Sequence, residues 1–98
     1  MVIHIKTQAT GGHIIVYVIN SNGVKVLTVK DNGTGNCALA PGYNYRFEFH
    51  VWGSQSADYS IHARVTPPNE GFQDFDWNRH YEGAHQDMGG FYFKLLNL

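Results

Sequence analysis

The stretch Tyr43-Asn-Tyr-Arg-Phe-Glu-Phe-His-Val-Trp52 decides the fold of this chain. Its odd-numbered positions are apolar up to Val51, and its even-numbered positions from Asn44 to His50 are polar. A period of two residues is typical of a β-strand with one buried face. The alternation returns in Asp58-Tyr-Ser-Ile-His-Ala-Arg-Val65 after a short polar loop. The two segments therefore predict a pair of antiparallel strands whose apolar side chains face the core.

Composition predicts a single small β domain over residues 1–98. The chain is long enough for one hydrophobic core. It combines 14% aromatic with 15% charged residues and contains 11 glycines, which is typical of short strands joined by tight turns. The formal net charge of −1 gives no electrostatic footprint for a polyanion, so we expect neither nucleic acid nor an anionic membrane as partner.

Cysteine usage and the N-terminus leave the cellular location open. Cys37 is the only cysteine, so no disulfide can form within the chain, and its apolar neighbours predict a small buried side chain. Residues 1–6 do not have the pattern of a signal peptide, and no apolar run reaches transmembrane length. We expect a soluble protein, and both a cytoplasmic origin and a mature secreted fragment stay open.

Four further strands follow from local patterns. The segment 13–20 is apolar on both faces and is predicted in the middle of a sheet. Ser21-Asn22-Gly23 predicts a type I′ hairpin turn, after which residues 24–29 return as its partner. The other two strands are expected at residues 2–7 and 91–96. Residues 31–36 are too rich in Gly and Asn for a regular element, and they lead into a short segment at residues 37–39 that brings the count to about seven.

Residues 66–90 are predicted to form one long loop. Thr66-Pro67-Pro68 ends the preceding strand, because proline cannot donate to a ladder. Loops of this length are commonly functional or disordered, and the aromatic content argues against disorder.

About seven strands without a convincing amphipathic helix predict an antiparallel β-sandwich of immunoglobulin-like size, with a small β-barrel as the alternative. Pro41-Gly42-x-x-Tyr45-x-Phe47, followed by Ala57-Asp-Tyr-Ser-Ile61, resembles the closing hairpin of bacterial Ig-like and pre-peptidase C-terminal β-sandwich modules. The resemblance covers about 25 residues. It implies a sandwich and assigns no functional residue.

The polar face of the predicted hairpin contains two histidines. A register that avoids opposing like charges places His50 opposite His62 and Glu48 opposite Arg64. The two imidazoles then form half of a metal site, a pH-responsive pair, or a solvated stack on the outer face.

Two clusters in the long loop resemble metal or catalytic sites. Asp74, Asp76 and Asn78 alternate like the opening of a calcium loop, although the remaining positions exclude an EF-hand. His80, Glu82 and His85 could ligate zinc or supply a general base, but their spacing fits neither a zinc-protease helix nor a zinc finger. The alternatives are Asx turns for the first cluster and a solvated loop for the second.

Aromatic and polar residues of the same loop predict a binding surface, which we place at residues 69–88. Flat apolar faces beside polar groups suit a glycan or a protein partner. The residues concerned are Trp77, Tyr81, Asn78, Arg79 and Glu82, with Trp52 as a further candidate. The sequence thus predicts a non-enzymatic binding module. A calcium-dependent module and a small metal-dependent enzyme are the alternatives.

We draw a further expectation from segments 13–20 and 91–96, each of which has a second apolar face. If either face lies uncovered in the monomer, it predicts a homo-oligomer interface.

Overall fold

The computed structural model describes residues 1–97, which form eight β-strands and no helix. The strands are β1 (Val2–Thr10), β2 (His13–Ile19), β3 (Lys25–Lys30), β4 (Thr34–Ala38), β5 (Asn44–Gly53), β6 (Ala57–Thr66), β7 (Phe75–Tyr81) and β8 (His85–Lys94).

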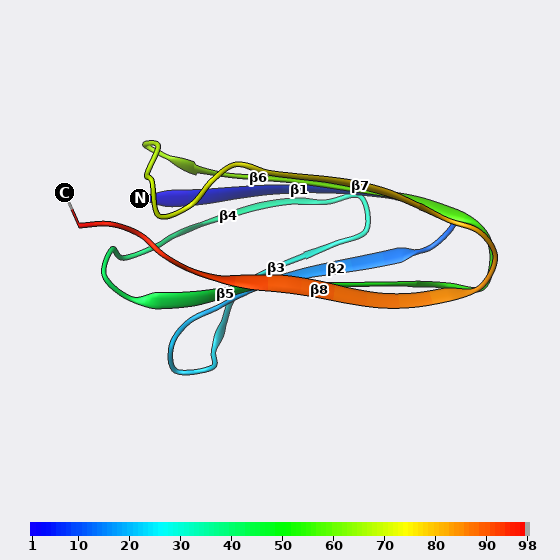
Figure 1. The fold of residues 1–98 in the computed structure, drawn as a ribbon, viewed down its shortest axis with the longest axis horizontal. Helices are drawn as coiled ribbons and strands as arrows, with labels where there is room; N and C mark the ends of the chain where they lie inside the picture. Colours follow the sequence, from blue (N-terminus) through cyan, green and yellow to red (C-terminus); the bar gives the residue numbers. More distant parts are fainter. Residues whose placement is uncertain (98) are drawn as a thin grey trace.

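The strands form two antiparallel sheets that pack face to face (Figure 1). Sheet A has the order β4-β1-β6-β7, and sheet B has the order β3-β2-β5-β8. Each sheet keeps two edge strands, so the predicted sandwich is confirmed and the alternative barrel is wrong. Segment 13–19 lies between β3 and β5, which confirms its predicted place in the middle of a sheet.

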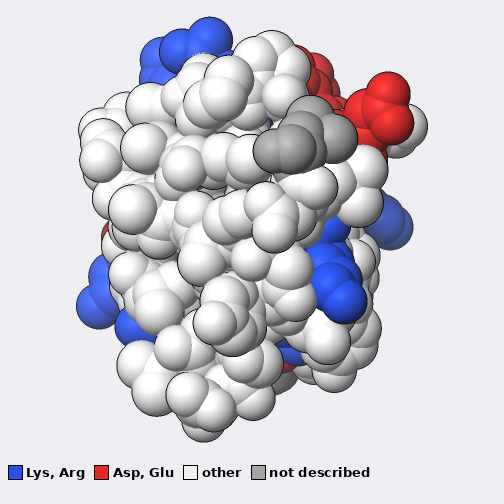
Figure 2. All heavy atoms as spheres, turned by 90° about the vertical axis from the view of Figure 1, so that its left-hand side faces the viewer, with Lys and Arg blue, Asp and Glu red and all other residues white. Residues whose placement is uncertain are grey.

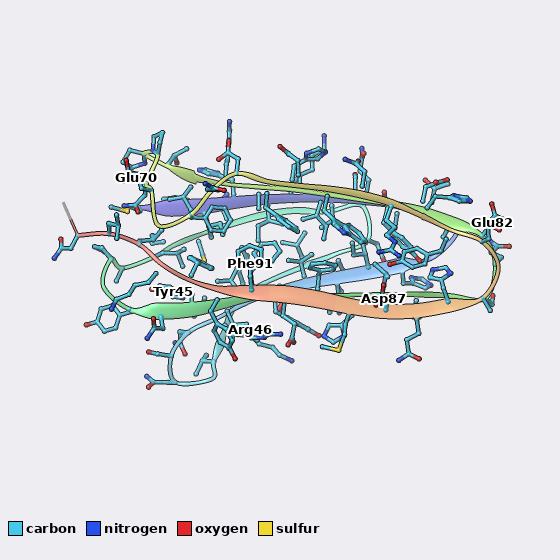
Figure 3. The ribbon with its side chains drawn as sticks, in the orientation of Figure 1. Tyr45, Arg46, Glu70, Glu82, Asp87 and Phe91 are labelled. Atoms are coloured by element: carbon cyan, nitrogen blue, oxygen red, sulfur yellow. The ribbon has the colours of Figure 1, made fainter. Side chains whose placement is uncertain are left out.

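The core lies between the sheets and follows the period-two pattern. Phe47 and Ile61 are fully buried, and Phe49 is nearly so. The neighbouring residues Arg46 and Glu48 lie on the outer face of sheet B; in Figure 3 Arg46 extends away from the sandwich, whereas Phe91 extends between the sheets. Burial of the alternate side chains fixes this register, because a shift of one residue would expose every apolar group.

The predicted hairpin between residues 43–52 and 58–65 is wrong. Both segments are strands, but β5 belongs to sheet B and β6 to sheet A, so residues 54–56 cross between the sheets. His50 lies beside Ile15 and Met88, whereas His62 lies beside Lys6 and Asp76. The two histidines are therefore on opposite outer faces and cannot form a shared site.

The predicted long loop is also wrong, because most of residues 66–90 is strand. Phe75, Trp77 and Tyr81 of β7 are partly buried, and the strand pairs with β6. β8 begins at His85 and runs through Gly89 and Gly90, which were expected to end a loop. The connection 67–74 remains irregular, and within it buried Phe72 packs against the ring of Phe93.

The turn between β2 and β3 occurs where the sequence places it, but it is not type I′. Only Gly23 has a positive φ angle, +79°, whereas type I′ requires two such residues. The Asn20 side-chain oxygen accepts hydrogen bonds from the amides of Asn22 and Val24. Residues 34–38, expected in part to be irregular, form the short strand β4, in which Cys37 is half-buried rather than buried.

Candidate functional site

The outer face of sheet B contains a groove in which aromatic and polar side chains meet. It has a volume of about 540 Å³. Strands β2 and β5 provide most of its lining, and β3 and β8 complete its sides; the side chains concerned are Ile15, Tyr17, Lys25, Glu48, His50, Trp52 and Gln86. All of them lie on strands and not on loops, so the sheet itself holds their positions.

Trp52 and Tyr17 provide the flat apolar surfaces of this groove. Trp52 is 42% exposed although it is a large aromatic residue. Its indole stacks on the His13 imidazole, with ring centroids 5.6 Å apart and planes inclined by 27°. Tyr17 is half-buried and contacts the edge of His50, while the Lys25 ammonium lies 4.1 Å from the centre of its ring. The neighbouring side chains thus orient both aromatic residues.

A line of charged and polar groups along β5 separates the aromatic residues. Arg46 Nε donates to Glu48 Oε1 at 3.1 Å, and His50 Nε2 lies 3.2 Å from Glu48 Oε2. Hydrogen bonds from His50 and then Arg46 lower the pKa of the Glu48 carboxyl below its ordinary value, against the opposing effect of burial. The carboxylate is therefore ionised at neutral pH and is fixed in place beside the groove.

Two exposed apolar residues continue this face beyond the groove. Met88 and Tyr92 of β8 are 57% and 75% exposed. The Arg46 guanidinium lies 4.9 Å from the centre of the Tyr92 ring. The outer face of sheet B therefore combines several exposed apolar groups with ordered charges.

The residues predicted for a binding loop lie elsewhere. Trp77 extends inward from β7, and its ring centre lies 4.8 Å from that of Phe49. Tyr81 also faces inward and donates a hydrogen bond to Asp87. Burial and this bond raise the pKa of Tyr81 to about 12. Arg79 is exposed beside Tyr81, with its guanidinium 5.0 Å from the ring centre. Trp77 and Tyr81 therefore serve the core rather than an exposed recognition loop.

The proposed calcium ligands are spread along a strand. Asp76 and Asn78 lie on the outer face of β7, and Asp74 precedes the strand. Asp76 accepts a hydrogen bond of 2.6 Å from His62 Nδ1. Within residues 1–97 no three His, Cys, Asp or Glu side chains converge in a way that could hold a metal ion. The alternating oxygens that resembled a calcium loop belong to the polar face of a strand.

The predicted catalytic cluster is only partly assembled. His80 contacts Asp58 and Glu82, both at 2.7 Å, and its hydrogen bonds to Glu82 and then to Asp58 raise its pKa. Glu82 lies at the end of the sandwich where β7 and β8 are joined (Figure 3). His85 instead faces inward, with Nδ1 2.9 Å from the Gly83 carbonyl and Nε2 2.6 Å from the Tyr59 hydroxyl.

The outer face of sheet A offers a contrasting hollow of about 430 Å³. Its lining includes His4, Lys6, His62 and Arg64, with Asp76 at the β7 side. It contains no aromatic residue other than histidine. Figure 2 views the end of the sandwich at which β1 begins, and the Lys, Arg, Asp and Glu side chains visible there lie mainly toward the edges of the view.

Sequence reasoning missed Ile15, Tyr17, Glu48 and His50 as parts of one groove. The signal was present in the second apolar face of segment 13–20, combined with the even-numbered residues that precede Trp52. Only the pairing of β2 with β5 places the two sets side by side.

Comparisons with protein families, with curated proteins and with solved structures find no match for this chain. Residues 1–97 contain no helix with the length and apolar character that crossing a membrane requires.

Proposed function

We propose that this chain is a non-catalytic binding module that holds a neutral glycan in the groove on the outer face of sheet B. The observation that carries the proposal is the exposed Trp52 indole beside the ordered Glu48 carboxylate and the Tyr17 ring. A pyranose ring has apolar C–H faces and polar hydroxyl edges, so it requires both kinds of group at once.

The individual roles follow from the side-chain chemistry. Trp52 would stack on one face of a sugar ring, because its own outer surface is exposed and its orientation is supported by His13. Glu48 would accept hydrogen bonds from sugar hydroxyls, and Lys25 and Gln86 would donate them. The site is preorganised by its hydrogen bonds, so little side-chain entropy would be lost on binding.

A glycan fits this face better than a protein partner does. The row Arg46, Glu48 and His50 crosses the middle of the surface, and a dry protein interface would have to remove water from all three groups. Sugar hydroxyls can replace that water and keep the groups hydrogen-bonded.

The experiment is titration of a panel of neutral oligosaccharides, built from glucose, mannose, galactose or N-acetylglucosamine, into the protein in a calorimeter. We expect at least one member to bind, and Trp52→Ala to weaken it by about tenfold or more. His62→Ala, on the opposite outer face, is the matched control and should leave affinity unchanged. Absence of binding across the panel, or equal effects of the two substitutions, would refute the proposal.

A further inference from the structure

The four edge strands of the sandwich are protected to different degrees. An edge strand presents unpaired amides and carbonyls, which can pair with another chain unless the edge is short, charged or irregular. Sheet A ends in β4 and β7, and sheet B ends in β3 and β8.

Three of these edges carry recognisable protection. β4 is only five residues long. β3 begins and ends with lysine, and its pairing with β2 is interrupted by a register shift at Val18/Ile19. β7 exposes Asp76, Arg79 and His80. Short length, terminal charge and irregular pairing each oppose the addition of a strand.

β8 lacks these protections over its central part. The strand is ten residues long, and the segment Met88-Gly-Gly-Phe-Tyr-Phe93 carries no charge and no proline. Tyr92 and Met88 are exposed on the outer face, and Phe91 is only half-buried on the inner face. An added strand would therefore find apolar side chains on both sides of the backbone ladder.

The two glycines do not interrupt this edge. A Cβ atom at Gly89 would lie 2.5 Å from Phe49 Cζ, and one at Gly90 would clash with the Phe47 carbonyl oxygen. Packing against β5 thus accounts for both glycines. Both remain paired with β5 in an unbroken register.

We propose that the occupant of this edge is a second copy of the chain, whose β8 pairs antiparallel with the first to give one continuous eight-stranded sheet. The segment is self-complementary: an antiparallel register centred on Gly90 places the exposed Met88 of one copy opposite the exposed Tyr92 of the other, both on the outer face. Antiparallel pairing also keeps the Lys94 side chains of the two copies at opposite ends of the pair, whereas parallel pairing would place Lys94 beside Lys94 and Asp87 beside Asp87.

The symmetry of this dimer would give the proposed glycan site a second function. Antiparallel pairing about a two-fold axis normal to the sheet keeps both outer faces on the same side. The two grooves would then face one surface together, so the dimer would bind a repetitive or immobilised glycan with avidity. This last step rests on the proposed glycan site, whereas the dimer itself does not.

Sedimentation equilibrium over a wide concentration range tests the dimer. We expect a reversible monomer–dimer equilibrium that Met88→Lys weakens by about tenfold or more, because each added lysine would replace the apolar contact with Tyr92 of the second copy and lie diagonally beside the Lys94 of that copy. Val26→Lys, at an exposed position of the opposite edge strand β3, is the matched control and should leave the equilibrium unchanged. Tyr92→Lys is the second variant if Met88→Lys does not fold, as judged by a thermal melt.

Two outcomes would overturn the proposal. One is a wild-type chain that stays monomeric at every concentration, even if an added extended peptide pairs with β8. The other is an association that Met88→Lys and Val26→Lys weaken equally. Retention on an immobilised glycan should fall for Met88→Lys while its affinity for a soluble oligosaccharide stays the same. If no oligosaccharide binds but the dimer forms, the glycan site fails and the edge pairing stands.

Discussion

The outer faces of the two sheets arise in the same way but carry different residues. Both arise because a strand with one buried face must expose every second residue. On sheet A the exposed positions carry paired polar groups, such as His62 with Asp76 and His80 with Asp58. On sheet B they carry Tyr17, Trp52, Met88 and Tyr92 among the charges.

Unlike the residues on the outer face of sheet A, those on the outer face of sheet B are not explained by folding alone. Exposed His–Asp pairs such as those on sheet A are expected on any surface that faces water, and they contribute little to stability. An exposed indole and a neighbouring exposed methionine gain nothing from facing water. Large apolar groups at these outward positions are the observation on which our proposal of a ligand-covered surface rests.

The largest expected effect is a difference in stability between substitutions of the two tryptophans. Trp77 faces the core, and Trp52 lies on the outer face. Trp77→Ala removes a ring that packs 4.8 Å from Phe49, and we expect it to lower the free energy of unfolding by about 2–3 kcal/mol. Trp52→Ala removes an exposed ring and should cost less than about 1 kcal/mol. Urea denaturation of both variants measures the contrast. Equal losses would show that Trp52 is structural and would remove it as a dedicated ligand contact.

A smaller effect compares one carboxylate from each outer face. Glu48 is 21% exposed and bonds to both Arg46 and His50, so Glu48→Gln should lower the free energy of unfolding by about 1 kcal/mol. Asp76 is 66% exposed and has His62 as its partner, so Asp76→Asn should change the free energy of unfolding by less than about 0.5 kcal/mol. Denaturant titration of the two variants at neutral pH provides the test. A larger loss for Asp76→Asn would reverse the ranking of the two faces.

The smallest effect is a pH dependence at the β7 end of sheet A. The pKa of His80 is raised above its ordinary value of 6.5, so its stabilisation is complete below pH 6.5 and is lost as pH rises through the folded-state pKa. The pKa of Glu82 is lowered from 4.5, so its contribution is present above pH 4.5 and is lost as pH falls through its folded-state pKa. Both contributions are complete between pH 4.5 and 6.5.

Thermal midpoints of the wild type and of His80→Gln, measured across this range, isolate that contribution. The wild type should have a higher thermal midpoint at pH 4.5–6.5 than at neutral pH, and we expect the substitution to reduce this difference. Identical profiles would mean that the ion pairs of His80 are too well solvated to affect folding.

Much of the fold could be predicted from alternation, because a half-buried strand must show it. Residues 43–52 and 58–65 are strands as expected, and the turn at Gly23 occurs at its predicted place. Alternation does not reveal the partner of a strand. A three-residue link such as 54–56 can close a hairpin or cross between sheets, and here it crosses.

The missed strand β7 has a different cause. Phe75, Trp77 and Tyr81 alternate with Asp76, Asn78 and His80, which is a strand pattern with one polar face. The same spacing of oxygens suggests a calcium loop, and the aromatic residues among them suggest a separate binding surface. The residues of the groove on sheet B show local signals, but Tyr17 meets Glu48 and His50 only through the pairing of β2 with β5, which no local pattern encodes.

Chemical-shift mapping of backbone amides during titration with the neutral oligosaccharide panel tests the central claim most directly. The account predicts that the perturbed amides gather on β2, on β5 from Glu48 to Trp52, and around Gln86 of β8. Perturbations gathered on the outer face of sheet A, around His4 and Arg64, or no perturbation with any member of the panel, would contradict it.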